Sequence, residues 1–297
     1  MSVPTIACIG AAHLDRRGIL HGPVVLGTSN PATVFTDFGG VARNVAMNLE
    51  RLECRVLLCS RVGDDESGRQ VRSQSIDTSL ITVSDRRPTA SYTAILEPGG
   101  ELVIGLADMD VYEELVPAIL MPALPSLQQA ALWFIDANLP HDTIGWLLGA
   151  AGDIPTAVDA VSVAKSQRLS ALISAIPYLF CNLAQASALL GTAFRDPATA
   201  SERLREAGSR SGIVSAGVGG IAVYDETAIK TMPALRAEPR DVTGAGDALI
   251  AGTLYGLTRH LDLVAAGRLG LAAAAITVES KDSTSPHLSP EVLNARA

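Results

Sequence analysis

The sequence predicts an α/β protein in which a mostly parallel central sheet is covered by helices on both faces, giving three layers, with a small antiparallel sheet beside it. Two observations indicate this class. After residue 109 the chain alternates between short apolar segments, typical of buried strands, and longer helical segments. Before residue 109, two turn-rich stretches with alternating polar and apolar residues interrupt that order, as expected of antiparallel excursions.

The composition fits a single domain that spans residues 1–297. Hydrophobic residues make up 48% of the chain and charged residues 18%, which allows a sizeable core. A net charge of −8 argues against binding to a nucleic-acid polymer. The best candidate for a membrane span, residues 269–278, is too short, and the N-terminus lacks the pattern of a secretory signal. Four cysteines without metal-ligand spacing indicate reduced thiols in a cytoplasmic protein that binds no zinc.

The first strand is expected at residues 5–10, where a β-branched run ends in glycine and leads to His13 and Asp15. Residues 16–37 and 88–108 approximately are then expected to form a small lid, because both contain turn signals between short alternating runs. A helix is expected from the glycine pair at 39–40 onwards. Further strands are expected at residues 56–63, 131–136, 156–159, 178–182, 212–215 and 220–224.

The segment Asp241–Asp247 contains two glycines and an alanine immediately before a helical pattern. Backbone N–H groups should converge there at a helix N-terminus, which favours an anion. An ordinary glycine-rich turn with an N-cap aspartate is the alternative interpretation of these residues. Asp247 would repel a phosphate unless it acts on the group that attacks the phosphate, as phosphoryl transfer requires.

Three separated motifs occur together in this chain. Gly39-Gly40 precedes Asn44, a strand ends at Asn182, and Asp241–Asp247 follows about 200 residues after the first motif. In this order, and with the lid stretches, they resemble the ribokinase-like (PfkB) family of carbohydrate and nucleoside kinases. The resemblance implies a ribokinase-like three-layer sandwich with a β-lid, and an ATP-dependent kinase that uses Mg²⁺.

Within that family the chain is most similar to the members that act on pseudouridine. The resemblance implies that Asp247 accepts the proton of a substrate's primary hydroxyl while N–H groups of Gly244, Ala245 and Gly246 hold the charge on the transferred phosphoryl group. Since a helix N-terminus lowers the pKa of an aspartate, we expect Asp247 to be ionised and a weak base at neutral pH.

The same resemblance implies a set of substrate-binding residues near the first strand, the early helix and the lid. Asp15 can accept hydrogen bonds from a vicinal diol, and glycine lets a sugar approach the backbone closely. His13 departs from the asparagine common in the family at this place and is left unassigned. The expected substrate-binding residues are Asp15, Ser29, Asn30, Gly39, Gly40, Asn44, Thr89, Ser91, Asp108 and Asn138.

The resemblance also implies where the nucleotide and its ions bind. The residues expected to contact ATP are Asn182, Ser215, Gly217, Gly219, Gly220 and Thr243. Asp241 and Thr243 match a loop that binds a monovalent cation, such as K⁺, in many members. Gln185 stands where the family often has an acid that orders Mg²⁺ through water; a neutral amide contributes no charge there, which leaves metal affinity open.

The expected function is phosphorylation of the 5′-hydroxyl of pseudouridine. The alternatives are a kinase for another nucleoside or for a ribose-type or fructose-type sugar, and a catalytically weakened nucleoside-binding sensor, which Gln185 favours. A dinucleotide-binding oxidoreductase is excluded because Gly10 to His13 lack the required glycine pattern. The expected partners are a small nucleoside or sugar and, from the resemblance, a second copy bound through the lid as a homodimer, without a nucleic acid or a membrane.

Overall fold

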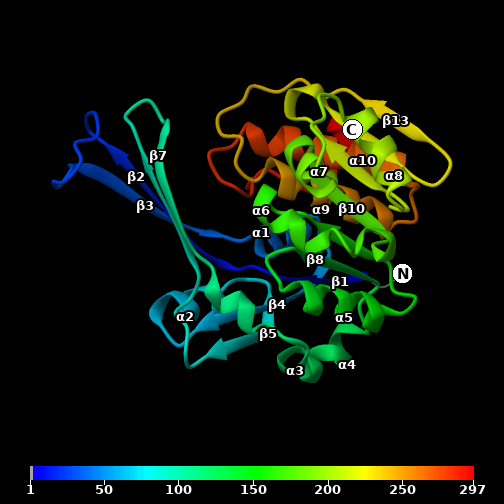
Figure 1. The fold of residues 1–297 in the computed structure, drawn as a ribbon, viewed down its shortest axis with the longest axis horizontal. Helices are drawn as coiled ribbons and strands as arrows, with labels where there is room; N and C mark the ends of the chain where they lie inside the picture. The colour runs from blue at the N-terminus through cyan, green and yellow to red at the C-terminus, as the bar shows by residue number, and fades with distance from the viewer. Residues whose placement is uncertain (1–2) are drawn as a thin grey trace.

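A twisted sheet of nine strands lies at the centre of the molecule in a computed structural model that describes residues 3–297 (Figure 1). Neighbouring strands run parallel from β5 to β11, and β12 and β13 complete one edge in antiparallel pairing. The order across the sheet is β13 (Ile229–Met232), β12 (Ile221–Tyr224), β11 (Gly212–Ser215), β10 (Tyr178–Asn182), β9 (Thr156–Asp159), β8 (Leu132–Asp136), β1 (Thr5–Ile9), β4 (Arg55–Gly63) and β5 (Asp77–Ser84).

Helices cover both faces of this sheet, which confirms the three-layer prediction. Along β1, Ile6 and Cys8 join one apolar core and Ala7 and Ile9 join the other, as the two-residue period of a strand requires. The first core packs against α1 (Val41–Arg51), α9 (Ala245–Leu257), α10 (Leu263–Val278) and α11 (Pro290–Arg296). The second packs against α3 (Pro117–Leu120), α4 (Leu124–Leu127), α5 (His141–Ala151), α7 (Leu183–Leu190) and α8 (Pro197–Glu206).

The remaining helices are short. They are α2 (Glu66–Arg72), α6 (Val163–Ser166) and the 3₁₀ turns η1 (Asp110–Glu114), η2 (Met121–Ala123), η3 (Gln167–Leu169), η4 (Ile173–Ala175) and η5 (Gly217–Gly219). Among the helices of residues 3–297, none combines the length and apolar character that crossing a membrane requires.

Every strand expected for the main sheet is present, whereas β5 and β13 were not expected. Both lie at the edges of the sheet, and several of their residues are exposed or half-buried. An edge strand has one unpaired side and tolerates polar residues, so its apolar signal in the sequence is weak.

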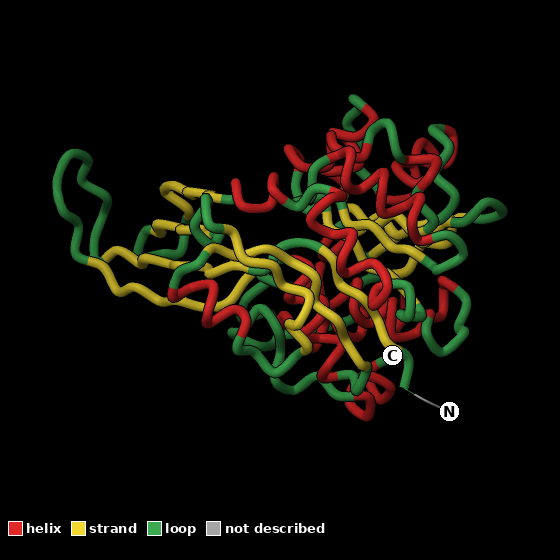
Figure 2. The backbone as a smooth tube through the Cα atoms, turned by 90° about the horizontal axis from the view of Figure 1, so that it is seen from below, coloured by secondary structure: helices red, strands yellow, loops and turns green. Residues whose placement is uncertain are grey.

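A second sheet of four strands projects from the body and forms the lid sheet (Figures 1 and 2). Its order is β3 (Ala32–Gly39), β2 (His13–Leu20), β6 (Ser91–Leu96) and β7 (Leu102–Asp108). The outer pairs are antiparallel hairpins, but β2 and β6 run parallel, so the sheet is mixed and not antiparallel throughout as expected. Both hairpins leave the body at the same end, which makes their first strands point the same way.

The strand register gives the lid sheet two different faces. Residues paired across the strands lie on the same face, and the two faces alternate along each strand. The Asp15 face carries Asp15, Arg17, Phe35 and Tyr92. The Val34 face carries Val34, Ile95, Ile104 and Leu106.

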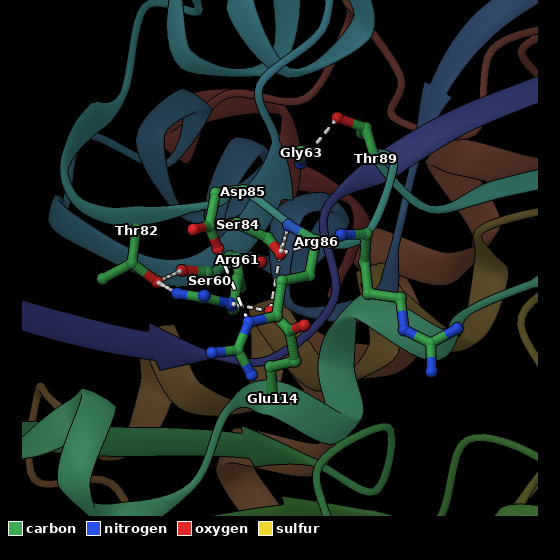
Figure 3. A network of polar contacts seen from close by, with 10 residues as sticks. Ser60, Arg61, Gly63, Thr82, Ser84, Asp85, Arg86, Thr89 and Glu114 are labelled. Atoms are coloured by element: carbon green, nitrogen blue, oxygen red, sulfur yellow. Dashed lines mark hydrogen bonds and ion pairs between the residues drawn. The ribbon is translucent and has the colours of Figure 1, made fainter.

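A polar network anchors the segments that flank β6 and β7 to the edge of the main sheet (Figure 3). Arg61 Nε and Ser84 Oγ both donate to the Oε2 atom of Glu114, at 2.8 and 2.6 Å. On the other side of the hairpin, Thr89 Oγ1 accepts a hydrogen bond of 2.9 Å from the N–H of Gly63. The base of the lid sheet is therefore fixed to β4 and β5.

Asp136, at the end of β8, joins three segments that are distant in the sequence. Its Oδ2 atom accepts hydrogen bonds from the N–H groups of Ala11 and Ala42, at 2.8 and 3.0 Å. Its Oδ1 atom accepts a third, of 2.9 Å, from the N–H of Asn138. The side chain is fully buried, and burial raises its pKa in spite of these donors.

We expect the Asp136→Asn substitution to lower the free energy of unfolding by about 2–3 kcal/mol, because an amide N–H₂ would face backbone N–H groups that need an acceptor. Urea denaturation measures the loss. The exposed Asp153→Asn variant is the matched control and should unfold at the wild-type midpoint. Equal midpoints for both variants would contradict the role given to Asp136.

Candidate active site

The carboxyl ends of β9, β10 and β11 and the start of α9 enclose a cavity of about 180 Å³. This is the edge of a parallel sheet where α/β proteins bind ligands. The cavity combines carboxylates, amides and a hydroxyl with apolar walls. It is lined by Val41, Asp159, Val161, Phe180, Cys181, Asn182, Gln185, Ile213, Ser215, Gly246, Asp247, Leu249 and Ile250.

The N-terminus of α9 borders this cavity through Gly246 and Asp247 and offers backbone N–H groups that can bind an anion. Gly244 caps the helix with φ 77°, and a Cβ atom there would lie 1.9 Å from the carbonyl oxygen of Ser283, so only glycine fits. Within the described residues, the N–H groups of Gly244, Gly246 and Asp247 have no hydrogen-bond partner. The N–H of Ala245 instead turns back to the carbonyl of Val242 at 3.3 Å, so it contributes less to the expected anion hole.

Asp247 is held by a chain of hydrogen bonds that begins on α1. Asn44 Nδ2 donates to Asp247 Oδ2 at 2.8 Å. Arg43 Nη1 in turn donates to Asn44 Oδ1 at 3.0 Å, which leaves only the N–H₂ end of the amide to face Asp247. Arg43 is itself buried, with its guanidinium over the ring of Phe38. The chain fixes the orientation of the Asp247 carboxylate.

The expectation that Asp247 is a weak, fully ionised base is wrong. Burial raises its pKa most, the charges of Asp136 and Asp15 raise it further, and the pKa reaches about 7 although the Asn44 hydrogen bond and the Arg43 charge oppose the rise. These effects outweigh the helix N-terminus. A carboxylate with this pKa is well suited to accept a proton near neutral pH.

Asp159 is the second carboxylate of the cavity. It lies at the end of β9 and accepts a hydrogen bond of 2.8 Å from the N–H of Val161. Burial, followed by the neighbouring charge of Asp247, raises its pKa to about 8. A bound cation would lower this pKa and favour the ionised form.

The base of the lid sheet brings Asp15 and Arg17 toward the same region. The Asp15 charge contributes to the raised pKa of Asp247. The Gly39 backbone lies directly against the Asp15 carboxylate. Gly40 caps α1, which carries Asn44. Arg17 Nη1 donates to Asp241 Oδ2 at 3.2 Å and so links the lid sheet to the Asp241–Asp247 loop.

Residues expected near the nucleotide divide into two groups. Asn182 and Ser215 line the cavity together with Gly246 and Asp247. Gly217, Gly219 and Gly220 form a turn after β11 outside the cavity wall, and Thr243 is an exposed residue of the Asp241 loop.

Five lid residues were expected to bind substrate, but the structure gives them other contacts or places them away from Asp15. The Thr89 hydroxyl donates to Asp65 at 2.6 Å and accepts from Gly63, so it is not free for a substrate. The register places Ser91 and Asp108 on the Val34 face, opposite Asp15, because each strand alternates its side chains.

The other two lie in the loop between β2 and β3, at the end of the lid sheet that projects from the body (Figure 1). Ser29 and Asn30 belong to this loop, and Asn30 Nδ2 donates to the carbonyls of Val25 and Thr28. Asn30 therefore stabilises the loop itself. Asn138, expected from the end of β8, lies beside Asp136 and is buried.

The residues expected at the ion sites already make polar contacts within the protein. Asp241 Oδ1 accepts from the N–H of Thr243 and Oδ2 accepts from Arg17, and a monovalent cation at this carboxylate stays a prediction. In a reciprocal helix cap, Gln185 Oε1 accepts from the N–H of Asn182 and Asn182 Oδ1 accepts from the N–H of Gln185.

The cap leaves the N–H₂ group of Gln185 for any ligand. This donor suits a phosphate oxygen. The Oε1 atom accepts one hydrogen bond in the cap and has a second lone pair, so the expected contact with a metal-bound water stays a prediction. Asp159 is the cavity carboxylate that fits a hydrated divalent cation held mainly by phosphates.

No site role was expected for Arg43, Asp136 or Tyr112. Arg43 adjoins Asn44, so its position in the motif was visible, but its contact with the Asn44 amide depends on side-chain conformation. Asp136 and Tyr112 accept hydrogen bonds from the N–H groups of Ala11 and Ala12, which lie 125 and 100 residues earlier in the sequence. No local pattern identifies such contacts. The reciprocal cap was visible, since Asn-x-x-Gln is a capping pattern.

The chain matches the description "pfkB family carbohydrate kinase" over residues 3–290. The pseudouridine kinase of Escherichia coli (strain K12) is 26% identical over 294 residues, which cover 96% of this chain and 93% of that protein. The solved structure of a carbohydrate kinase from Agrobacterium tumefaciens is 37% identical, with a TM-score of 0.87 and coverage of 99% and 96% of the two chains.

The fold is also that of a ribokinase. The structure of Arabidopsis thaliana ribokinase complexed with ribose and ATP has a TM-score of 0.89 at 18% identity, covering 99% of this chain and 98% of the other. The fold prediction is thereby confirmed. Since the family match spans nearly the whole chain and a relative is 37% identical over 99% of it, this protein belongs to the pfkB family and is a carbohydrate or nucleoside kinase.

Proposed function

We propose that this kinase transfers the γ-phosphoryl group of ATP to the 5′-hydroxyl of pseudouridine. The observation that carries the proposal is the position of Asp247, a carboxylate with a pKa of about 7, beside unpartnered N–H groups at a helix N-terminus. A proton acceptor and a phosphoryl-binding site are thus adjacent. Similarity to the E. coli pseudouridine kinase supports the acceptor, and another nucleoside or a ribose-type or fructose-type sugar is the alternative.

In the proposed reaction the acceptor hydroxyl lies against Asp247, with Asn44 and Asp15 holding the sugar. The O–H bond breaks as the oxygen forms its bond to the γ-phosphorus, and Asp247 takes the proton. The bond between the γ-phosphorus and the bridging oxygen breaks, and ADP leaves with that electron pair. The N–H groups of Gly244, Gly246 and Asp247 stabilise charge on the transferred group.

We place the nucleotide phosphates between Gly246 and the pair Asn182 and Ser215, where the cavity is lined by donors. The Gln185 N–H₂ group adds a donor toward a phosphate oxygen. Mg²⁺, when bound with the nucleotide, neutralises phosphate charge, and Asp159 is the residue that would hold it. Four buried and unpaired cysteines support a reducing compartment, the cytoplasm, for this enzyme.

We also propose a homodimer that pairs the Val34 faces of two lid sheets. Val34, Ile104 and Leu106 are 65%, 50% and 56% exposed on this face. An exposed apolar sheet face favours burial against a partner surface. The Asp15 face stays turned toward the cavity in this arrangement.

Asp247→Asn should reduce kcat by about 10³-fold, because the amide accepts no proton, while pseudouridine still binds. Coupled ADP release with pseudouridine, uridine, ribose and fructose, with and without Mg²⁺, identifies the acceptor. Calorimetry measures binding to the variant, and Asp153→Asn should retain wild-type kcat. Near-normal turnover by Asp247→Asn would contradict the role of Asp247 as the base. A wild-type protein that binds nucleoside but phosphorylates none of the four acceptors would favour the alternative of a nucleoside-binding sensor.

The rate should depend on pH through Asp247. Below its pKa of about 7 the carboxyl is protonated and accepts no proton, so kcat/KM should rise with pH and level off above this value. Arg43 lowers this pKa, so Arg43→Met should move the rise to higher pH. Arg55→Met, an exposed change at the opposite end of the sheet, is the control and should leave the profile unchanged. A profile that is flat from about pH 5.5 to 8 would contradict this role.

The wild type should have the mass of a dimer in light scattering after size exclusion, and Ile104→Lys should have the mass of a monomer, because a charge would be buried in the apolar contact. Val292→Lys places the same charge on an exposed valine of α11 and should remain dimeric. A monomeric wild type would exclude the dimer at the concentration measured.

A further inference from the structure

A line of polar contacts runs from the core of the protein to Asp15 at the base of the lid sheet. The N–H of Ala12 donates to Tyr112 Oη at 3.0 Å. Tyr112 Oη lies 3.2 Å from His13 Nδ1, and His13 Nε2 lies 3.2 Å from Asp15 Oδ1. Tyr112 is fully buried, His13 is 8% exposed and the Asp15 side chain is 30% exposed. The line therefore ends where a ligand can reach it.

The Tyr112 hydroxyl determines which nitrogen of His13 carries the proton. A backbone N–H can only donate, so Tyr112 Oη is the acceptor toward Ala12 and its own proton remains available. Burial, with a smaller effect of the Asp136 charge, raises the pKa of Tyr112 well above its ordinary value, so the hydroxyl keeps its proton. Among the hydrogen bonds of the described residues, His13 Nδ1 is the one acceptor within reach of this buried hydroxyl, so we infer that the hydroxyl donates to it. The imidazole proton then lies on Nε2, which faces Asp15 Oδ1 at 3.2 Å.

The other side of the Asp15 carboxylate is closed by backbone. A Cβ atom on Gly39 would lie 2.2 Å from Asp15 Oδ2, so the carboxylate packs directly against the Gly39 Cα. The register pairs Gly39 with His13, which places both on one side of the strand pair. The Asp15 carboxylate is thus fixed between the His13 ring and the Gly39 backbone.

We propose that Tyr112 and His13 are positioning residues for the acceptor: they hold the Asp15 carboxylate in the orientation that accepts a hydrogen bond from a sugar hydroxyl. The inference rests on the proposed function in so far as Asp15 binds the acceptor. Neither residue lines the cavity of Asp247, so the pair acts on acceptor binding and leaves phosphoryl transfer unchanged.

The first test needs no substrate. In protein with ¹⁵N-labelled histidine, the nitrogen shifts of His13 should be those of the Nε2–H tautomer, and Tyr112→Phe should abolish that preference. The protein has five histidines, so the His13 signal must be assigned. It is the signal that disappears from the spectrum of the His13→Gln variant. A wild-type His13 that carries its proton on Nδ1, or exchanges between tautomers, overturns the proposal.

The second test separates acceptor binding from turnover with the acceptor that ADP release identifies. Tyr112→Phe and His13→Leu should raise KM for the acceptor about tenfold, with kcat and KM for ATP within about twofold of wild type. His13→Gln should restore most of the loss, because its terminal N–H₂ can donate where Nε2–H does. A purely structural role predicts equal defects in the glutamine and leucine variants.

Tyr224→Phe is the matched control. It also removes the hydroxyl of a fully buried tyrosine, one that bonds Ser209 Oγ at 2.8 Å on a different part of the sheet, and should leave every kinetic constant unchanged. An unchanged KM in Tyr112→Phe beside an active wild type overturns the positioning role alone. A wild type that phosphorylates none of the acceptors overturns the kinase assignment and, with it, the role of Asp15.

Discussion

One buried carboxylate, that of Asp136, joins the chain segments from which the site is built. Its three backbone donors belong to the loop after β1, the first turn of α1 and the loop after β8. Asn44 follows Ala42 on the same turn of α1, and His13 follows Ala11 by two residues. Asp136 therefore fixes α1, whose Asn44 donates to Asp247 on α9, relative to the loop that leads to His13 and Asp15.

The fold was predictable where its cause is local. Central strands bury both faces and so read as continuous apolar runs, which located β1, β8, β9, β10 and β11. The Gly-Ala-Gly-Asp start of α9 was predictable because its conformation depends on neighbouring residues. The edge strands β5 and β13 were not, since only tertiary pairing makes them strands.

Sequence motifs predicted some of the proximities in the candidate site but not the properties of its side chains. Asn44 does contact Asp247 and the Asp15 charge acts on it, but the pKa of Asp247 depends on burial and on charges from three other segments. The face on which Ser91 and Asp108 lie depends on strand register, which a one-residue shift would invert. Directions of hydrogen bonds, as at His13 and Gln185, follow only once the fixed donors around each side chain are known.

The hydrogen bond between Arg17 and Asp241 marks the boundary between a supported and an unsupported part of the lid sheet. Beyond Arg17 along β2, no side-chain hydrogen bond within the described residues joins this strand to the main body. A sheet supported at one end behaves as a cantilever, so displacement grows with distance from the support. Asp15 lies near the start of β2, at the support, and the loop between β2 and β3 lies at the free end (Figure 1). Side chains near the support, such as Asp15, are therefore held more firmly relative to Asp247 than side chains of the loop at the free end.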